Sequence, residues 1–217
     1  MKTATSERPP VLALEPHAAP AVARHDSTLR HLLTSVLFTI VSIVLLGLIY
    51  PAVMTGLSVV LFPSQANGSF VSVNGKVVGS RIIGQLFTKP QYFHGRPSAA
   101  GKNGYDPTAT GATNLAPTSK KLIDATRAAI VALRKENPDA QGSIPMDLVT
   151  SSGSGIDPDI SPESAYYQAP RVAKLHGLPL SRVRALIDAH VQQRELGFLG
   201  EPHVNVLELN MALDRLH

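Results

Sequence analysis

The 217-residue chain contains no cysteine and no tryptophan, and only 5% of its residues are aromatic. The lack of cysteine excludes disulfide scaffolds, thiolate nucleophiles and cysteine metal ligands. The net charge is only +4, and the basic residues form no block. With so few aromatic side chains, the sequence predicts neither a groove that follows phosphates nor a platform for stacked bases. We therefore expect no nucleic-acid partner.

Motifs for common catalytic and metal-binding chemistry are also missing. The segment 68–76 ends in Gly-Lys, but its spacing is too long for a phosphate-binding loop, and Val77 replaces the hydroxyl residue that would hold magnesium. The stretch from Asp157 begins like a calcium loop but has Pro162 where a turning glycine is required. Ser154 lies between glycines without the nucleophile-elbow pattern. We expect no catalytic residue and no metal site, although a membrane-anchored extracytoplasmic enzyme stays an alternative.

The most informative feature that is present is an uncharged apolar run from Leu32 to Phe62. Residues 32–49 alone, at about 1.5 Å per helical residue, extend roughly 27 Å, close to the thickness of a hydrocarbon core. Pro51 lacks an amide donor and is predicted to kink the helix near the far interface, with Tyr50 at headgroup depth. A cleavable signal peptide is the alternative, but its apolar core is typically only about 7–15 residues. We expect an uncleaved single-pass anchor in contact with lipid.

The residues before the apolar run indicate its orientation. This short segment carries Lys2, Arg8, Arg24 and Arg30, and short segments rich in Lys and Arg stay in the cytoplasm. The sequence therefore predicts a cytoplasmic N-terminus and an extracytoplasmic C-terminal domain at the cell inner membrane. The expected organisation is a disordered, proline-containing tail at 1–31, a transmembrane helix with an outer-interface extension at 32–62, and one domain at 63–217.

The first half of that domain contains signals for a hairpin and a helix. Apolar and polar residues alternate from Ser69 to Gly84 around Asn74-Gly75, a dipeptide that suits a tight hairpin turn. This pattern predicts two short strands. Farther along, Thr118 is expected to cap a helix with apolar residues at three- and four-residue steps, and Asn137-Pro138 is expected to end it.

The second half mixes short strands with helices. Ser161 is a predicted N-cap, followed by Pro162 and Glu163 in the first turn. Pro170 inside this helix is expected to destabilise it by about 3 kcal/mol or to kink it. The sequence is therefore compatible with one helix or with two short helical pieces. The expected elements are a strand from Asp147, helical residues 162–176, a helix from Ser181 to Arg194, a strand from Val204 and a short terminal helix. The predicted fold class is α+β.

Several long motifs, in one order, carry a resemblance that covers Leu32 to Leu213. They include YPAVMTG at Tyr50, FPSQANGS at Phe62, PQYFHGRPSA at Pro90, VTSSGSGIDPDIS at Val149 and GEPHVNVLELNMALD at Gly200. With these motifs the chain resembles the C subunit of the Kdp potassium-transporting P-type ATPase of bacteria and archaea. The resemblance implies a non-catalytic accessory subunit with one transmembrane helix. It also implies two partners for potassium import, a channel-like potassium-binding subunit and an ATP-hydrolysing P-type subunit.

The candidate contact residues fall in the membrane helix and in the domain. Small residues of the helix permit close approach to a partner helix in lipid, and the candidates there are Gly47, Tyr50, Pro51, Thr55 and Gly56. As a hypothesis, the domain caps the potassium entrance and stabilises the complex through Gln85, Tyr92, Phe93, Arg96 and Asp157.

The resemblance also implies a catalytic-chaperone role that raises the ATP affinity of the catalytic subunit. The suggested nucleotide contacts are Ser152, Gly153, Ser154, Gly155 and Gln168. Direct contact conflicts with the predicted topology, because ATP is cytoplasmic and these residues are expected on the other side of the membrane. We expect this chain to hold no cofactor tightly and to meet ATP only through the complex. A nucleotide-binding regulator stays an alternative function.

Overall fold

The computed structural model describes residues 27–216, and these form two compact units that divide between Met54 and Thr55. Residues 1–26 of the expected disordered tail lie outside the described residues. The remaining residues of that tail begin helix α1 (Thr28–Ser42), in which the Ser27 Oγ accepts a hydrogen bond from the Arg30 amide at 3.4 Å. The helix therefore starts at Thr28 rather than at Leu32.

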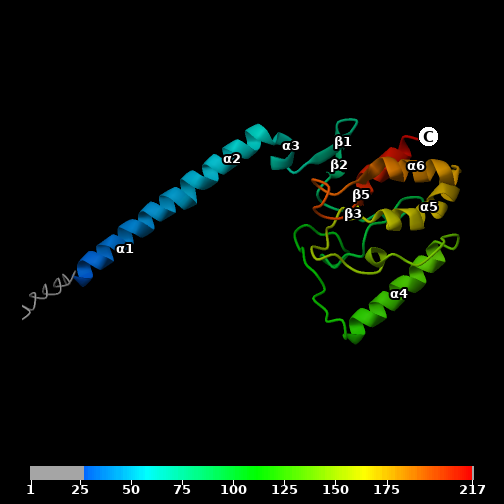
Figure 1. Ribbon diagram of the computed structural model, residues 1–217, viewed down its shortest axis with the longest axis horizontal. Helices are drawn as coiled ribbons and strands as arrows, with labels where there is room; N and C mark the ends of the chain where they lie inside the picture. The colour runs from blue at the N-terminus through cyan, green and yellow to red at the C-terminus, as the bar shows by residue number, and fades with distance from the viewer. Residues whose placement is uncertain (1–26, 217) are drawn as a thin grey trace, which may run out of the picture. The chain divides into compact units, whose positions relative to one another are not determined.

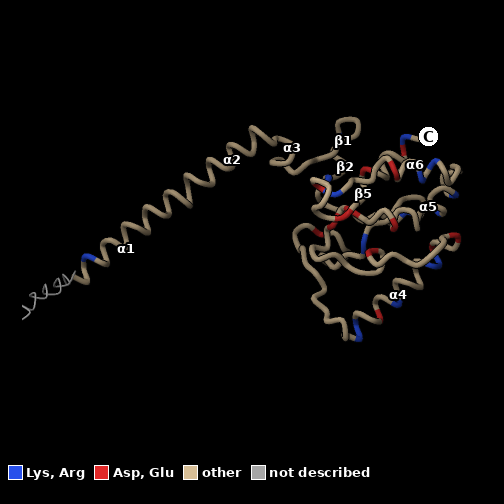
Figure 2. Tube along the Cα trace, viewed as in Figure 1, with Lys and Arg blue, Asp and Glu red and all other residues tan. Residues whose placement is uncertain are grey.

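One apolar helix runs from Thr28 to Leu61, and it is long and apolar enough to cross a membrane. It consists of α1, a π-helical segment η1 (Ile43–Ile49) and α2 (Tyr50–Leu61), and none of its residues is buried. Figure 2 shows no charged residue along it beyond its first turn.

The distortion expected at Pro51 takes the form of this π-helical segment. The Tyr50 amide donates to the carbonyl of Leu45, five residues back instead of four. Because a proline ring crowds the turn that precedes it, a wider turn on its N-terminal side accommodates Pro51 without ending the helix.

The second unit contains α3 (Pro63–Ala66) and then the predicted hairpin. Strands β1 (Phe70–Val73) and β2 (Lys76–Ser80) pair antiparallel. Asn74 and Gly75 have φ values of 50° and 77°, which a tight hairpin turn requires. The hairpin prediction is confirmed.

A small antiparallel sheet and three helices surround the core (Figure 1). The sheet has the order β3-β5-β4, so β5 is central. These elements are β3 (Asp159–Ile160), α5 (Pro162–His176), α6 (Leu180–His190), β4 (Val191–Gln192), β5 (His203–Asn205) and α7 (Val206–Asp214). The side chains with no exposed surface include Phe93, Val172, Val183, Ile187, Val204, Leu209 and Leu213. The α+β prediction is confirmed.

The predicted helix before Asn137 is present as α4 (Lys120–Glu136), and no residue of it is fully buried. Its N-cap is Ser119 instead of Thr118, and Ser119 makes no side-chain capping hydrogen bond. Charged residues of both signs are spread along α4 (Figure 2). It is a mostly solvent-facing helix.

The strand predicted from Asp147 is wrong, and the strand predicted from Val204 is present but shorter than expected, because side chains stabilise helical turns there. Instead of a strand from Asp147, the chain forms a 3₁₀ turn, η2 (Met146–Leu148), and the Asp147 carboxylate accepts a hydrogen bond from the Ser161 amide at 2.8 Å. The strand predicted from Val204 ends at Asn205, whose Oδ1 accepts from the Glu208 amide at 3.2 Å and so caps α7.

Helix α5 spans the predicted residues as one helix, whereas α6 ends earlier than predicted. Helix α5 is continuous through Pro170, because its buried face, including Val172, packs into the core and outweighs a penalty of about 3 kcal/mol. Helix α6 ends at His190 instead of Arg194, since Val191 takes an extended conformation and pairs with Val204 of β5.

Candidate functional site

Two buried amide side chains hold the segment 90–94, which we call the clamped segment. The Phe93 amide donates to Asn210 Oδ1 at 2.9 Å, and Asn210 Nδ2 donates to the Phe93 carbonyl at 3.0 Å. Gln168 pairs with the backbone of His94 in the same way, at 2.8 and 3.0 Å. Asn210 lies on α7 and Gln168 on α5, so two helices fix the segment as a neighbouring strand would.

Gln168 is only 1% exposed and uses its whole hydrogen-bonding capacity inside the chain. Besides its bonds to His94, its Oε1 accepts from Arg171 Nη2 at 2.9 Å, and its Nε2 donates to the Ser164 carbonyl at 3.3 Å. A primary amide offers two acceptor positions and two donor hydrogens, and all four are occupied. Gln168 therefore has no group left for a nucleotide in this conformation.

Arg171, also buried, joins the clamped segment to the end of α4. Its Nε donates to Asn137 Oδ1 at 2.9 Å, and its Nη1 donates to the carbonyls of Pro90 and Tyr92, the latter at 3.0 Å. Burial lowers the pKa of Arg171, and the Glu136 carboxylate, 3.8 Å away, acts in the opposite direction. Five donor positions in one rigid fork suit this role better than a lysine ammonium.

His94 connects the clamped segment to the Glu136 carboxylate. Its Nδ1 lies 3.0 Å from Glu136 Oε1, and its Nε2 lies 3.0 Å from the Lys89 carbonyl. Both ring nitrogens therefore lie within hydrogen-bonding distance of an oxygen atom. The hydrogen bond from His94 is the largest cause that lowers the pKa of Glu136, and it acts against desolvation.

Arg96 and Asp157, two of the predicted external contacts, form an ion pair with Nη1 and Oδ2 3.0 Å apart. Both side chains are partly exposed. The Tyr105 hydroxyl donates to the Arg96 carbonyl at 2.7 Å, and burial, followed by the charge of Asp157, raises the pKa of Tyr105 to about 12. Arg96 and Asp157 are 61 residues apart in the sequence, and the fold brings their side chains into contact.

The other three predicted external contacts serve the fold in different ways. Phe93 is completely buried in the core, so it presents no surface to a partner, and its inclusion among surface contacts needs correction. The Tyr92 hydroxyl donates to Asp214 Oδ2 at 3.2 Å. Gln85 Nε2 donates to the Val78 carbonyl at 3.0 Å beside the hairpin.

The loop 152–155, predicted as a nucleotide contact, is fastened to its neighbours. The buried Ser152 Oγ accepts from the Gly155 amide at 2.8 Å, and the Ser154 carbonyl accepts from the Gly111 amide at 2.8 Å. Gly155 has a φ of 72°, and a Cβ there would lie 2.8 Å from that of Ala100. Of the predicted nucleotide contacts, Gly153 and Ser154 are exposed.

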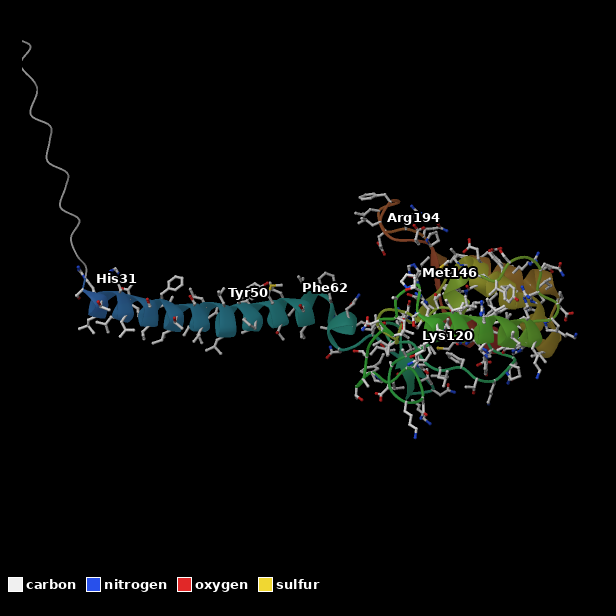
Figure 3. The ribbon with its side chains drawn as sticks, turned by 90° about the horizontal axis from the view of Figure 1, so that it is seen from below. His31, Tyr50, Phe62, Lys120, Met146 and Arg194 are labelled. Atoms are coloured by element: carbon white, nitrogen blue, oxygen red, sulfur yellow. The ribbon has the colours of Figure 1, made fainter. Side chains whose placement is uncertain are left out.

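The predicted membrane contacts all lie on the surface of the apolar helix. They are Gly47 in η1 and Tyr50, Pro51, Thr55 and Gly56 in α2. A Cβ added at Gly56 would meet nothing within 4 Å. Side chains project around the helix in Figure 3, where Tyr50 is labelled. These residues are free to meet lipid or another helix, and their role as contacts stays a prediction.

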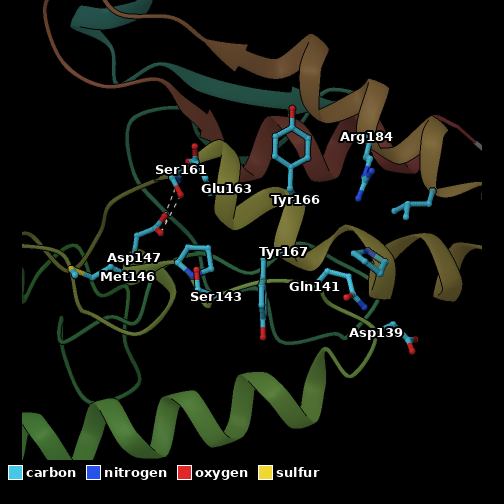
Figure 4. A pocket seen from close by; sticks show the side chains of 13 residues that line it. Asp139, Gln141, Ser143, Met146, Asp147, Ser161, Glu163, Tyr166, Tyr167 and Arg184 are labelled. Carbon is cyan, nitrogen blue, oxygen red and sulfur yellow. Dashed lines mark hydrogen bonds between the residues drawn. The ribbon is translucent and has the colours of Figure 1, made fainter.

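Sequence reasoning missed a groove of about 730 Å³ beside the start of α5 (Figure 4). Its lining includes Tyr166, Tyr167, Met146, Glu163 and Arg184. These residues come from separate segments, so no local motif indicates the groove. Among residues 27–216, no group of three His, Asp or Glu side chains is arranged to hold a metal ion.

Comparisons with known proteins agree on one family. The family model for KdpC, the K⁺-transporting ATPase c chain, matches residues 32–215. The chain is similar to the potassium-transporting ATPase KdpC subunits of Koribacter versatilis, with 52% identity over 186 residues, and of Acidobacterium capsulatum, with 53% over 189 residues. The first alignment covers 85% of this chain and 94% of the relative, and the second covers 87% and 100%. The relative from Caulobacter vibrioides is 56% identical over 190 residues, which cover 87% of this chain and 93% of the relative.

Proposed function

This chain belongs to the KdpC family, the c chains of K⁺-transporting ATPases, and we propose that it is a non-catalytic accessory subunit of such a complex. The helix Thr28–Leu61, in which no residue is buried, carries this proposal together with the family. An apolar surface of this length needs lipid and partner helices to cover it. The partners are a channel-like potassium-binding subunit and an ATP-hydrolysing subunit.

The proposed orientation places the domain outside the cell membrane and residues before the helix in the cytoplasm. The cations that precede the apolar run support this direction of insertion. In this position the domain caps the external entrance for potassium and stabilises the complex. The Arg96–Asp157 pair and Tyr92 are partly exposed and belong to the proposed capping surface.

The proposed mechanism is positioning instead of nucleotide binding. Gln168 holds the backbone of His94, and Ser152 holds its own loop, so both act on neighbouring segments of this chain. An effect of these residues on the ATP affinity of the complex is therefore proposed to be indirect. Labelling of this chain by a photoreactive ATP analogue within the purified complex would favour the alternative, a nucleotide-binding regulator.

A truncation tests the proposed function. A variant ending at Phe62 keeps the membrane helix and loses the domain, and it is compared with the full chain after coexpression with the other subunits. We expect potassium-dependent growth and potassium uptake to be lost, either with the complex still assembled, which indicates capping, or with the complex dissociated, which indicates assembly. Normal uptake by an assembled complex of the truncated chain contradicts both roles.

A further inference from the structure

The chain between β4 and β5 forms a hairpin tip, residues 193–202, with three large apolar side chains in the open. Leu196 is 81% exposed, Phe198 68% and Leu199 50%. In Figure 3 the loop that carries Arg194 projects from the body of the domain. Single exposed apolar residues are common on protein surfaces, but a cluster at one loop tip is typical of a contact surface.

The hairpin tip is held in shape by its own backbone. The amides of Gly197, Phe198 and Leu199 donate to carbonyls within the turn at 2.9 to 3.2 Å. Gly197 and Gly200 have φ values of 82° and 76°, and a backbone bridge joins Glu195 to Leu199. The apolar side chains are thus presented by a preformed turn, which lowers the entropy that a partner must remove on binding.

The base of the hairpin tip is tied to the core. Val191 of β4 pairs with Val204 of β5, and Val204 has no exposed surface. Arg194 and Glu201 form an ion pair across the base. A fixed base and a preformed turn make the tip a rigid projection instead of a loose loop.

The charges around the tip favour a protein over lipid as its binding partner. Arg194 is paired with Glu201, whereas Glu195 forms no ion pair within residues 27–216. The local excess is therefore negative, which disfavours contact with anionic lipid headgroups, because these attract Lys and Arg. A protein surface with a basic rim complements the same pattern.

We propose that the hairpin tip docks Leu196, Phe198 and Leu199 into an apolar pocket with a basic rim on the extracytoplasmic face of another subunit of the complex. This inference rests on the proposed function. Exposed aromatic residues on preformed turns are frequent anchors of interfaces, and removing an anchor of this kind weakens binding at least about tenfold.

Matched substitutions test the proposal. Phe198→Ser is compared with Val131→Ser, because Val131 on α4 is also 68% exposed. The affinity of each full-length variant for the complex that lacks this subunit is measured in nanodiscs. We expect Phe198→Ser to weaken binding at least about tenfold and Val131→Ser to leave it within about twofold. Equal affinities of the two variants overturn the proposal.

Crosslinking identifies the molecule that the hairpin tip contacts. A photoreactive phenylalanine analogue at position 198 is expected to form an adduct with another subunit in the purified complex, while the same analogue at position 131 does not. Adducts with lipid alone, or none at all, overturn the docking proposal while the proposed function stands. If the unmodified chain fails to copurify with the other subunits, the proposed function itself is contradicted, and the docking proposal falls with it.

Discussion

The clamped segment and the hairpin tip each carry a phenylalanine outside the helices and strands, but the two side chains differ in exposure. Phe93 is 0% exposed and Phe198 is 68% exposed. Amide side chains from two helices hold the backbone around Phe93, whereas the backbone around Phe198 is held by its own turn. Contacts within this chain cover Phe93, whereas Phe198 is proposed to be covered by another subunit.

Substitutions of these two phenylalanines are expected to differ strongly in their effect on the stability of the chain. Phe93→Ala removes a fully buried ring and is expected to lower the free energy of unfolding by about 3–5 kcal/mol. Phe198→Ala is expected to change it by no more than about 0.5 kcal/mol. Urea unfolding of the full chain in detergent, followed by circular dichroism, measures both. Similar losses for the two variants would contradict the comparison.

A second substitution tests the charge that holds the clamped segment. Arg171→Met leaves the Asn137 side chain and the carbonyls of Pro90 and Tyr92 without their donor. We expect a loss of about 2–4 kcal/mol, because several buried acceptors become unpaired at once. Arg182→Met, on the exposed side of α6, is the control and is expected to be nearly neutral in the same unfolding measurement.

A third substitution distinguishes a positioning role of Gln168 from a ligand role. Gln168→Leu removes the paired bonds to His94 and is expected to cost about 1–3 kcal/mol in the absence of any nucleotide. A residue kept for ATP alone would leave the stability of the nucleotide-free chain unchanged. The midpoint of thermal unfolding without ATP decides between the two.

The smallest expected effect depends on pH. The His94 hydrogen bond lowers the pKa of Glu136 below its ordinary value of 4.5, so ionised Glu136 stabilises the folded chain above that value. This contribution is lost as the pH falls through the lowered pKa. Glu136→Gln should therefore cost about 1 kcal/mol at pH 7, and the difference from the unsubstituted chain should shrink in acid. A difference that is constant with pH would contradict this assignment.

Local patterns were sufficient for some elements of the fold. Asn74-Gly75 specifies its turn through residues that tolerate positive φ, and the apolar run specifies the long helix by length and composition. Prediction from local patterns fails where a residue distant in the sequence determines the backbone conformation. Asp147 accepts a bond from Ser161, 14 residues away, and its surroundings form a 3₁₀ turn instead of a strand.

The clamped segment lay beyond sequence reasoning for the same reason. Asn210 bonds to Phe93 across 117 residues and Gln168 to His94 across 74 residues. Neither spacing belongs to a local motif, so the sequence alone does not indicate that Gln168 and Phe93 are held inside the fold. The family resemblance suggests Gln168 as a nucleotide contact instead, and the capping hypothesis includes Phe93 as a surface contact. Arg96 and Asp157 were both predicted as external contacts, and the structure adds that they pair with each other.

Cysteine labelling in intact cells determines on which side of the membrane the domain lies, and the proposed side is extracytoplasmic. Since the chain has no cysteine, Ser154→Cys on the exposed loop introduces a single thiol, and Ser6→Cys before the helix serves as its counterpart. We expect a membrane-impermeant maleimide to label position 154 in intact cells and position 6 only after permeabilisation. Labelling of position 154 only in permeabilised cells would place the domain in the cytoplasm, where ATP is found, and would rule out the proposed orientation.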